Sequence, residues 1–256
     1  MPAPALRPRS ASELVDAAFQ IMRAHYPQFV MCSAIAYLPW LIVQLVLVTD
    51  PTRLARLTPG VSVVFGLGVW LVFALMTAVV VVCASQAYLG DPVDVGAAVR
   101  KALPRMPLVL LGAIVRYVGM FLGLFAFFIG ALYVVARWFA VTPVIVLEGQ
   151  GLGRALSRSA VLSKGRKRHI INTLGLAALI YWLLAVGVQL AAYFLMGNAI
   201  VQTIATAVYT ILVYPVVAIT EALLYFDTRI KHEGFDIELM AGALEGDDVT
   251  REPAAP

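Results

Sequence analysis

Long runs of apolar residues dominate this chain, and short polar segments separate them. A helix needs about 20 mostly apolar residues to cross roughly 30 Å of hydrocarbon. Runs of this length predict transmembrane helices at 29–48, 61–85, 108–128, 131–147, 170–196 and 200–226. The stretch from 107 to 147 is too long for one span, so we divide it at Ile129-Gly130, and Gly197-Asn198 predicts a tight turn in the last hairpin.

A short polar segment precedes each predicted pair of spans, at residues 10–26, 94–105 and 151–164. In the first segment, Ser10 and Glu13 have the spacing of a helix capping box, and a polar stripe lies opposite an apolar one. These segments predict short amphipathic helices at the membrane surface, with Pro27 ending the first. The three segments either belong to three repeated units, each with one surface helix and two spans, or are the basic inner loops that any polytopic protein has.

We therefore predict an all-α fold: a membrane helical bundle of about six transmembrane helices in three hairpins, with cytoplasmic interfacial helices. Residues 1–28 form a cytoplasmic segment that contains the first amphipathic helix. Residues 29–226 form the membrane domain, and residues 227–256 form a cytoplasmic tail. The end of this tail is acidic and then rich in Pro and Ala, so we expect it to be disordered.

The composition makes lipid the expected solvent for most of the chain. Of the 256 residues, 61% are hydrophobic and 13% are charged. Soluble domains average roughly 45–50% apolar and about 25% charged residues. One water-soluble core would not bury this much apolar surface, so we predict an integral membrane protein.

The distribution of Lys and Arg predicts the orientation. If the N-terminus is inside, the outer loops hold only Arg53 and Arg56, while the inner segments carry most of the basic residues. This asymmetry predicts that both termini lie in the cytoplasm. The expected partners are membrane lipids and other membrane proteins, with no nucleic acid, because the basic residues cluster at span ends. Cys32 and Cys83 are expected to be free thiols, and we predict no metal and no cofactor.

Four segments carry a resemblance to a known family: residues 6–19, 137–149, 153–159 and 224–236. In them the chain resembles the bacterial glycerophosphodiester phosphodiesterase membrane-domain family, and it is similar to uncharacterised six-span families of the YciC type. Members of the family commonly have Pro-Gly before the fourth span, where this chain has Ile129-Gly130. Fused members carry a separate soluble phosphodiesterase domain. We expect no room for that domain here, so the resemblance does not imply its activity.

Three ionisable residues fall inside predicted spans, where an unpaired charge costs several kcal/mol. We hypothesise that Arg116, Arg137 and Glu221 form a buried cluster, with Gln44 and Gln189 as neutral members. One interpretation is a hydrated cavity that binds an anion or a lipid headgroup. The other is an interhelical clasp that fixes packing, or arginines that extend to the interface.

A basic segment lies just inside the fifth predicted span. Each of its charges contributes about 1 kcal/mol near an anionic leaflet. It is either a docking site for headgroups or partners, or ordinary positive-inside anchoring. The segment consists of Lys164, Arg166, Lys167 and Arg168.

No motif in the sequence indicates catalysis. The chain has no His-Glu-x-x-His pattern, no Gly-x-Ser-x-Gly elbow and no Gly-rich phosphate loop with its Lys. We therefore expect no enzyme and favour a structural, accessory or assembly role. A small transporter or channel for an anion or lipid-like solute is the alternative, and a membrane enzyme acting on lipid comes third.

Overall fold

The computed structural model describes residues 10–49 and 59–233. This part of the chain is helical throughout and contains no strand, so the predicted all-α fold is confirmed. The predictions for residues 1–9, for the loop with Arg53 and Arg56, and for the end of the tail lie outside the described residues. The helices are α1 (Ala11–Ala24), α2 (Tyr26–Thr49), α4 (Pro59–Leu89), α5 (Val95–Ala102), the 3-10 helix η1 (Leu103–Arg105), α6 (Met106–Leu124), α7 (Ile129–Arg137), α8 (Val141–Leu147), α9 (Leu152–Leu162), α10 (Lys167–Met196), α11 (Ala199–Val213) and α12 (Pro215–Glu233).

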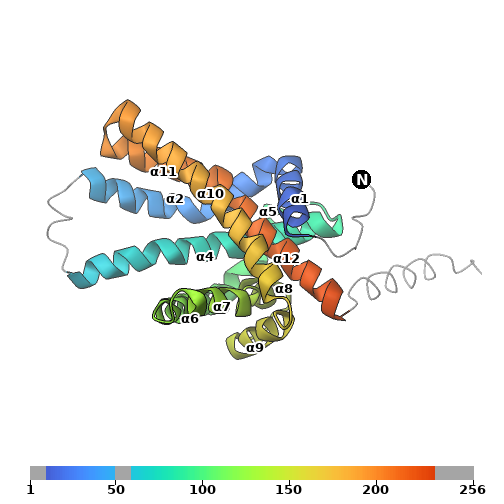
Figure 1. The fold of residues 1–256 in the computed structure, drawn as a ribbon. Helices are drawn as coiled ribbons and strands as arrows, with labels where there is room; N and C mark the ends of the chain where they lie inside the picture. Colours follow the sequence, from blue (N-terminus) through green and yellow to red (C-terminus); the bar gives the residue numbers. More distant parts are fainter. Residues whose placement is uncertain (1–9, 50–58, 234–256) are drawn as a thin grey trace, which may run out of the picture.

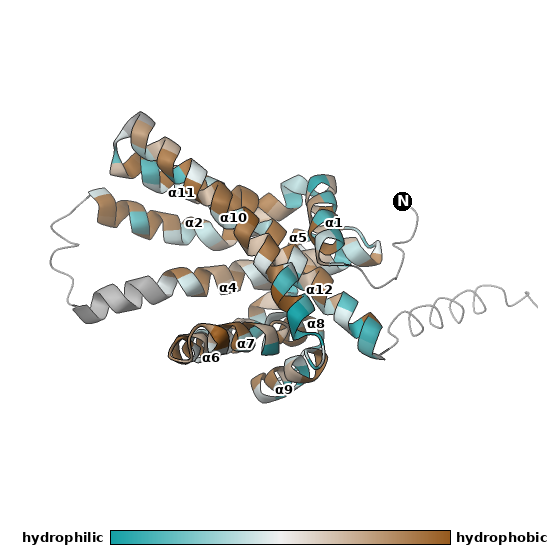
Figure 2. Ribbon diagram, viewed as in Figure 1, coloured by the Kyte–Doolittle hydropathy of each residue, from teal (hydrophilic) through white to brown (hydrophobic). Residues whose placement is uncertain are grey.

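Among the described residues, six helical stretches are long and apolar enough to cross a membrane. Figure 2 shows that α4, α6 and most of α10 are hydrophobic, whereas hydrophilic residues gather on α1, at the start of α10 and at the end of α12. The six stretches are 26–49, 68–89, 95–124, 129–147, 167–194 and 199–232.

A short amphipathic helix precedes each pair of long ones. Ser10 caps α1, because its hydroxyl accepts from the Glu13 amide (3.3 Å) and its own amide donates to the Glu13 carboxylate (2.8 Å). Asp94 caps α5 by accepting from the Ala97 amide at 3.0 Å. The helix α9 occupies the same place before α10 and α11. The order of elements thus follows the three-unit pattern, and the origin of that pattern in a repeat stays a prediction.

Two prolines change the predicted helix boundaries. Pro27 does not end the first amphipathic helix, which stops at Ala24, and lies instead in the first turn of α2. There its missing amide hydrogen costs no helical hydrogen bond. The last predicted span is broken by Pro215, so α11 ends at Val213 and α12 begins after Tyr214.

The larger of the two hydrophobic core clusters includes residues of α1, α4, α8 and α12, which gather in the same part of the molecule (Figure 1). The apolar face of α1 is buried there, including Leu14 and Ala18. Phe29 of α2, Ile145 of α8 and Tyr225 of α12 are fully buried in the same cluster. In contrast, α2 and α10 leave most of their side chains outside the core. The bundle is therefore tight around α8 and α12 and exposes apolar surface elsewhere.

The hairpin of α6 and α7 depends on glycine. Figure 1 views these two helices nearly along their axes, close together beside α4. A Cβ atom on Gly123 would lie 2.5 Å from the backbone of Gly130 and Ala131. A Cβ on Gly119 would lie 2.8 Å from the Trp138 ring. Glycine therefore allows the two helices to approach closely within this hairpin.

Candidate functional site

Arg116 of α6 and Glu221 of α12 form an ion pair inside the bundle. Nη1 of Arg116 lies 3.9 Å from Oε1 of Glu221, and the two side chains are 17% and 10% exposed. The Arg116 guanidinium also lies over the Tyr117 ring, 5.6 Å from its centroid. The structure thus brings together two members of the hypothesised cluster. Each charge reduces the cost of burying the other.

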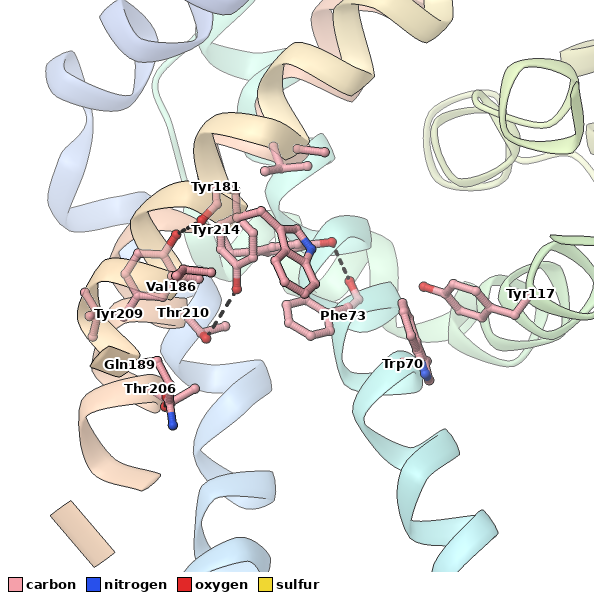
Figure 3. A pocket seen from close by; sticks show the side chains of 15 residues that line it. Trp70, Phe73, Tyr117, Tyr181, Val186, Gln189, Thr206, Tyr209, Thr210 and Tyr214 are labelled. Carbon is pink, nitrogen blue, oxygen red and sulfur yellow. Dashed lines mark hydrogen bonds between the residues drawn. The ribbon is translucent and has the colours of Figure 1, made fainter. Parts of the chain in front are cut away.

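An aromatic cavity of about 540 Å³ lies beside this pair (Figure 3). Its volume falls within the roughly 300–1,000 Å³ typical of small-molecule sites. Trp70 and Trp182 are 48% and 67% exposed, so the cavity is open on their side. The aromatic residues that line it are Trp70 and Phe73 of α4, Tyr117 of α6, Tyr181 and Trp182 of α10, Tyr209 of α11 and Tyr214.

The hydroxyl groups of the cavity wall bond mainly to one another and to the backbone. Tyr214 and Thr77 share a hydrogen bond of 2.8 Å between their hydroxyls. The Tyr209 hydroxyl donates to the Tyr181 carbonyl. Thr206 donates to the side-chain oxygen of Gln189 at 2.8 Å, which gives Gln189 a place in the wall. Because these polar groups already have partners, the wall presents mostly rings and aliphatic carbon to the cavity.

The ion pair stands behind this wall. Tyr117 lines the cavity and is the neighbour of Arg116 in the chain, and Val217 lines it one helical turn before Glu221. Neither Arg116 nor Glu221 is itself a lining residue. The hypothesised charged cluster and the cavity are therefore adjacent but separate features.

Arg137 lies apart from the other two members of the hypothesised cluster. Its side chain is exposed, and its Nη1 donates to the Tyr133 hydroxyl at 3.0 Å. Within residues 10–49 and 59–233, no ion pair joins Arg137 to Glu221. The cluster predicted from the sequence therefore loses one arginine, which stands on the outside of the bundle.

Arg137 lies outside the bundle because the fourth predicted span is broken. The helix α7 ends at Arg137, three residues follow, and α8 then begins at Val141. The buried Ser159 hydroxyl of α9 fills this break, because it accepts from the Ala140 amide and donates to the Arg137 carbonyl, both at 3.0 Å. Residues 141–146 are all buried, so α8 turns into the protein. Depth counted along a straight span therefore misplaced Arg137.

The structure divides the predicted basic segment into two pairs. Arg166 Nη2 donates to a carbonyl in the last turn of α12 at 3.0 Å, and Lys167 Nζ lies 4.1 Å from the centroid of the Tyr133 ring. Lys164 and Arg168 are exposed. Contacts with other helices thus distinguish Arg166 and Lys167 from the two exposed residues of the segment.

Sequence reasoning missed a second polar centre, built around Glu148 at the end of α8. Its carboxylate oxygens both lie 3.3 Å from Arg158 Nε, and Oε1 accepts from the Tyr225 hydroxyl at 2.7 Å. This contact ties α8, α9 and α12 together. All three residues fall in or near segments that carry the family resemblance, but nothing local in the sequence indicates that they meet.

A third polar contact holds α12 against the start of α10. The Asp227 carboxylate is buried and lies 2.5 Å from Lys231 Nζ and 3.3 Å from His169 Nε2. In the part of the chain that the structure describes, no three His, Cys, Asp or Glu side chains gather as a metal site requires. Cys32 and Cys83 are free and fully buried, with their sulfur atoms 3.1 Å apart.

These features define an all-helical polytopic integral membrane protein, with its charges paired inside or placed at the edge of the bundle. Residues 111–230 match the family model described as the membrane domain of glycerophosphoryl diester phosphodiesterase. The resemblance to that membrane-domain family is therefore confirmed over these residues, which make up just under half of the chain. Residues 6–19 lie outside the match. Searches of curated proteins and of solved structures found no significant match.

Proposed function

We propose that this protein is a non-enzymatic integral protein of the bacterial inner membrane, with a structural, accessory or assembly role. The observation that carries the proposal is the pairing of Arg116 with Glu221 inside the bundle, behind the wall of the cavity. A carboxylate that already neutralises a buried arginine acts as an interhelical clasp. It joins α6 of the middle hairpin to the central helix α12.

The proposed topology has both termini in the cytoplasm. Its support is the location of exposed basic residues, which lie on or next to the three short helices: Arg23 on α1, Arg100 and Lys101 on α5, and Arg154 on α9. The end of α12 lies at the same side of the molecule as α1 (Figure 1). The positive-inside rule assigns this side to the cytoplasm.

Single-cysteine labelling in intact cells tests this topology. Ser157→Cys on the exposed face of α9 should stay unlabelled by a membrane-impermeant maleimide until the cells are opened. Asn198→Cys, in the α10–α11 turn, should react in intact cells. The native cysteines are fully buried and provide a low background. The reverse pattern would reject the proposed orientation.

Transport of an anion or a lipid-like solute is a second candidate, and the aromatic cavity favours it. Ala178→Cys and Val217→Cys place a thiol in the cavity wall. A structural role predicts that an impermeant maleimide reaches neither thiol from either side, whereas a lipid-soluble maleimide labels them. Labelling by the impermeant reagent would show an aqueous path and favour anion transport. Accelerated scrambling of fluorescent phospholipid in proteoliposomes would favour a lipid-like solute.

The proposal includes the absence of enzymatic activity. The family model describes a membrane domain, so the match gives no reason to expect the activity of a phosphodiesterase domain in this chain. Incubation of the purified protein with glycerophosphodiesters should release no alcohol above that of an Arg116→Gln, Glu221→Gln variant. Hydrolysis that depends on these two residues would contradict the proposal.

A further inference from the structure

Two cations from different helices meet at one tyrosine on the outside of the bundle. Arg137 of α7 donates to the Tyr133 hydroxyl at 3.0 Å, and its Cζ lies 5.9 Å from the ring centroid. Lys167, the first residue of α10, holds its Nζ 4.1 Å from the centroid of the same ring. Both positive groups therefore lie within 6 Å of the centre of the same ring.

Among residues 10–49 and 59–233, no carboxylate compensates these two charges. In the part of the chain that the structure describes, neither Arg137 nor Lys167 takes part in an ion pair. The carboxylates of Glu148 and Asp227 are bound to other cations. Two like charges held together repel each other, and an anion between them would remove that repulsion and gain charge-assisted hydrogen bonds. The electrostatic complement of this cluster is thus a single anionic group.

The cluster is accessible and lies at the level of the surface helices. Arg137 is exposed, and Tyr133 is 43% exposed. The Arg137 carbonyl accepts from Ser159 of the amphipathic helix α9, and Lys167 directly follows the basic turn that leads into α10. Amphipathic surface helices lie in the headgroup region of a membrane. Arg137 and Lys167 are therefore at the depth of lipid phosphates.

An apolar surface continues from the cluster along the same helix. Ile129, Tyr133 and Arg137 follow one another at intervals of four residues, so they share one face of α7. Ile129 is 73% exposed, and the neighbouring Phe128 is 70% exposed. Eight residues separate Ile129 from Arg137, about 12 Å along a helix, which is within the roughly 30 Å hydrocarbon layer. This face changes from cationic to apolar in the direction from headgroup to acyl chain.

We propose that Arg137 and Lys167, held by Tyr133, bind the phosphate of an anionic phospholipid whose acyl chains lie along the exposed face of α7. The phosphate accepts from the guanidinium and the ammonium group. The apolar residues beyond Tyr133 select a lipid over a soluble phosphate. The assignment of this lipid to the cytoplasmic leaflet rests on the proposed topology, but the binding site itself does not.

Lipid retention by purified protein tests the site. The protein is placed in nanodiscs of mixed phosphatidylglycerol and phosphatidylcholine, extracted in mild detergent, and analysed for bound lipid by native mass spectrometry. One charge near an anionic headgroup contributes about 1 kcal/mol, which is roughly a fivefold change in affinity. Arg137→Gln and Lys167→Gln should therefore each lower phosphatidylglycerol retention about fivefold. Using both variants keeps the test valid if one of them folds poorly.

Arg168→Gln is the matched control, because it removes one exposed charge from the residue next to Lys167. It should retain phosphatidylglycerol like the unchanged protein. Equal losses in all three variants would show unspecific attraction and overturn the site, as would unchanged retention in Arg137→Gln and Lys167→Gln. Displacement of the lipid by millimolar inorganic phosphate would show a soluble-anion site and overturn the lipid assignment. Reversed labelling in cells would reject the proposed orientation while leaving this result intact.

Discussion

The interior around Arg116 and the surface around Arg137 give two arginines of one hairpin opposite environments. Both residues fall inside apolar segments of the sequence. Arg116 lies on a continuous helix, is largely buried, and reaches Glu221 of α12. Arg137 is the last residue of a helix of nine residues, is exposed, and reaches a tyrosine. The comparison teaches that helix continuity, rather than distance along an apolar run, decides whether a charge in a membrane protein needs a counter-charge.

The difference also divides the two residues by role. A buried ion pair restricts how α6 and α12 pack, because removing one partner leaves the other unpaired in a medium of low dielectric. An exposed arginine beside a lysine does not restrict packing in this way and can exchange its partner for a lipid phosphate. The two roles should therefore differ in their effect on the free energy of unfolding.

The largest effect is expected for Glu221→Gln. This change keeps the shape of the side chain but leaves the Arg116 charge uncompensated, which should lower the free energy of unfolding by about 3–5 kcal/mol. Titration with a denaturing detergent, followed by circular dichroism, measures the loss. Asp91→Asn, which removes an exposed carboxylate after α4, is the control and should change stability by less than about 0.5 kcal/mol.

The double variant Arg116→Gln, Glu221→Gln sharpens this prediction. It removes both charges, so it should be more stable than Glu221→Gln alone by about 1–3 kcal/mol. If the losses of the two single variants simply add, the residues do not act as a pair and the clasp is wrong.

The sequence was sufficient for the overall fold and for one side of this comparison. Runs of apolar residues predict the helices, because lipid requires every backbone group to be bonded within its own helix. Arg116 and Glu221 were hypothesised to meet because both are ionisable and lie inside predicted spans, and they do meet because both helices stay regular at those positions. The break at Pro215 also has a local signal, since proline lacks the amide hydrogen that a helix interior uses.

The position of Arg137 and the aromatic cavity depend on contacts that no local pattern encodes. The break after Arg137 is filled by the hydroxyl of Ser159, 22 residues away in the sequence. The aromatic cavity collects residues of α4, α6, α10 and α11, and each of them resembles an ordinary lipid-facing residue in its own segment. Their convergence follows from packing in three dimensions.

The second largest effect is expected for Gly123→Ala, in the hairpin that carries both arginines. The new methyl group would lie 2.5 Å from the backbone of α7, and backbone does not move aside as a flexible side chain does. We expect a loss of about 2–3 kcal/mol in the free energy of unfolding. Gly175→Ala on α10, where a Cβ meets nothing within 4 Å, is the control and should be neutral or slightly stabilising. Similar losses in both variants would indicate a general cost of replacing glycine.

Ser159→Ala should have an intermediate effect. It leaves the Ala140 amide and the Arg137 carbonyl without their partner at the break, at a cost of about 1–2 kcal/mol. Ser157→Ala, on the exposed face of α9, removes a hydroxyl of the same kind and should be neutral. If the Ser159 variant is equally neutral, the break is not held by this side chain, and another explanation for the position of Arg137 is needed.

The smallest effect on stability is expected for Arg137→Gln. This variant tests directly whether Arg137 differs in role from Arg116. The side chain is exposed, and its one side-chain hydrogen bond within the described residues is to an exposed phenol. Its loss should therefore lower the free energy of unfolding by no more than about 0.5 kcal/mol in lipid-free detergent. Added phosphatidylglycerol should raise the melting temperature of the unchanged protein more than that of the variant, because a ligand stabilises only the state that binds it. A loss as large as that of Glu221→Gln would mean that Arg137 is a packing residue after all. An equal response of both proteins to the lipid would remove Arg137 from the phosphate site and leave Arg116 as the one arginine of the hairpin with a defined role.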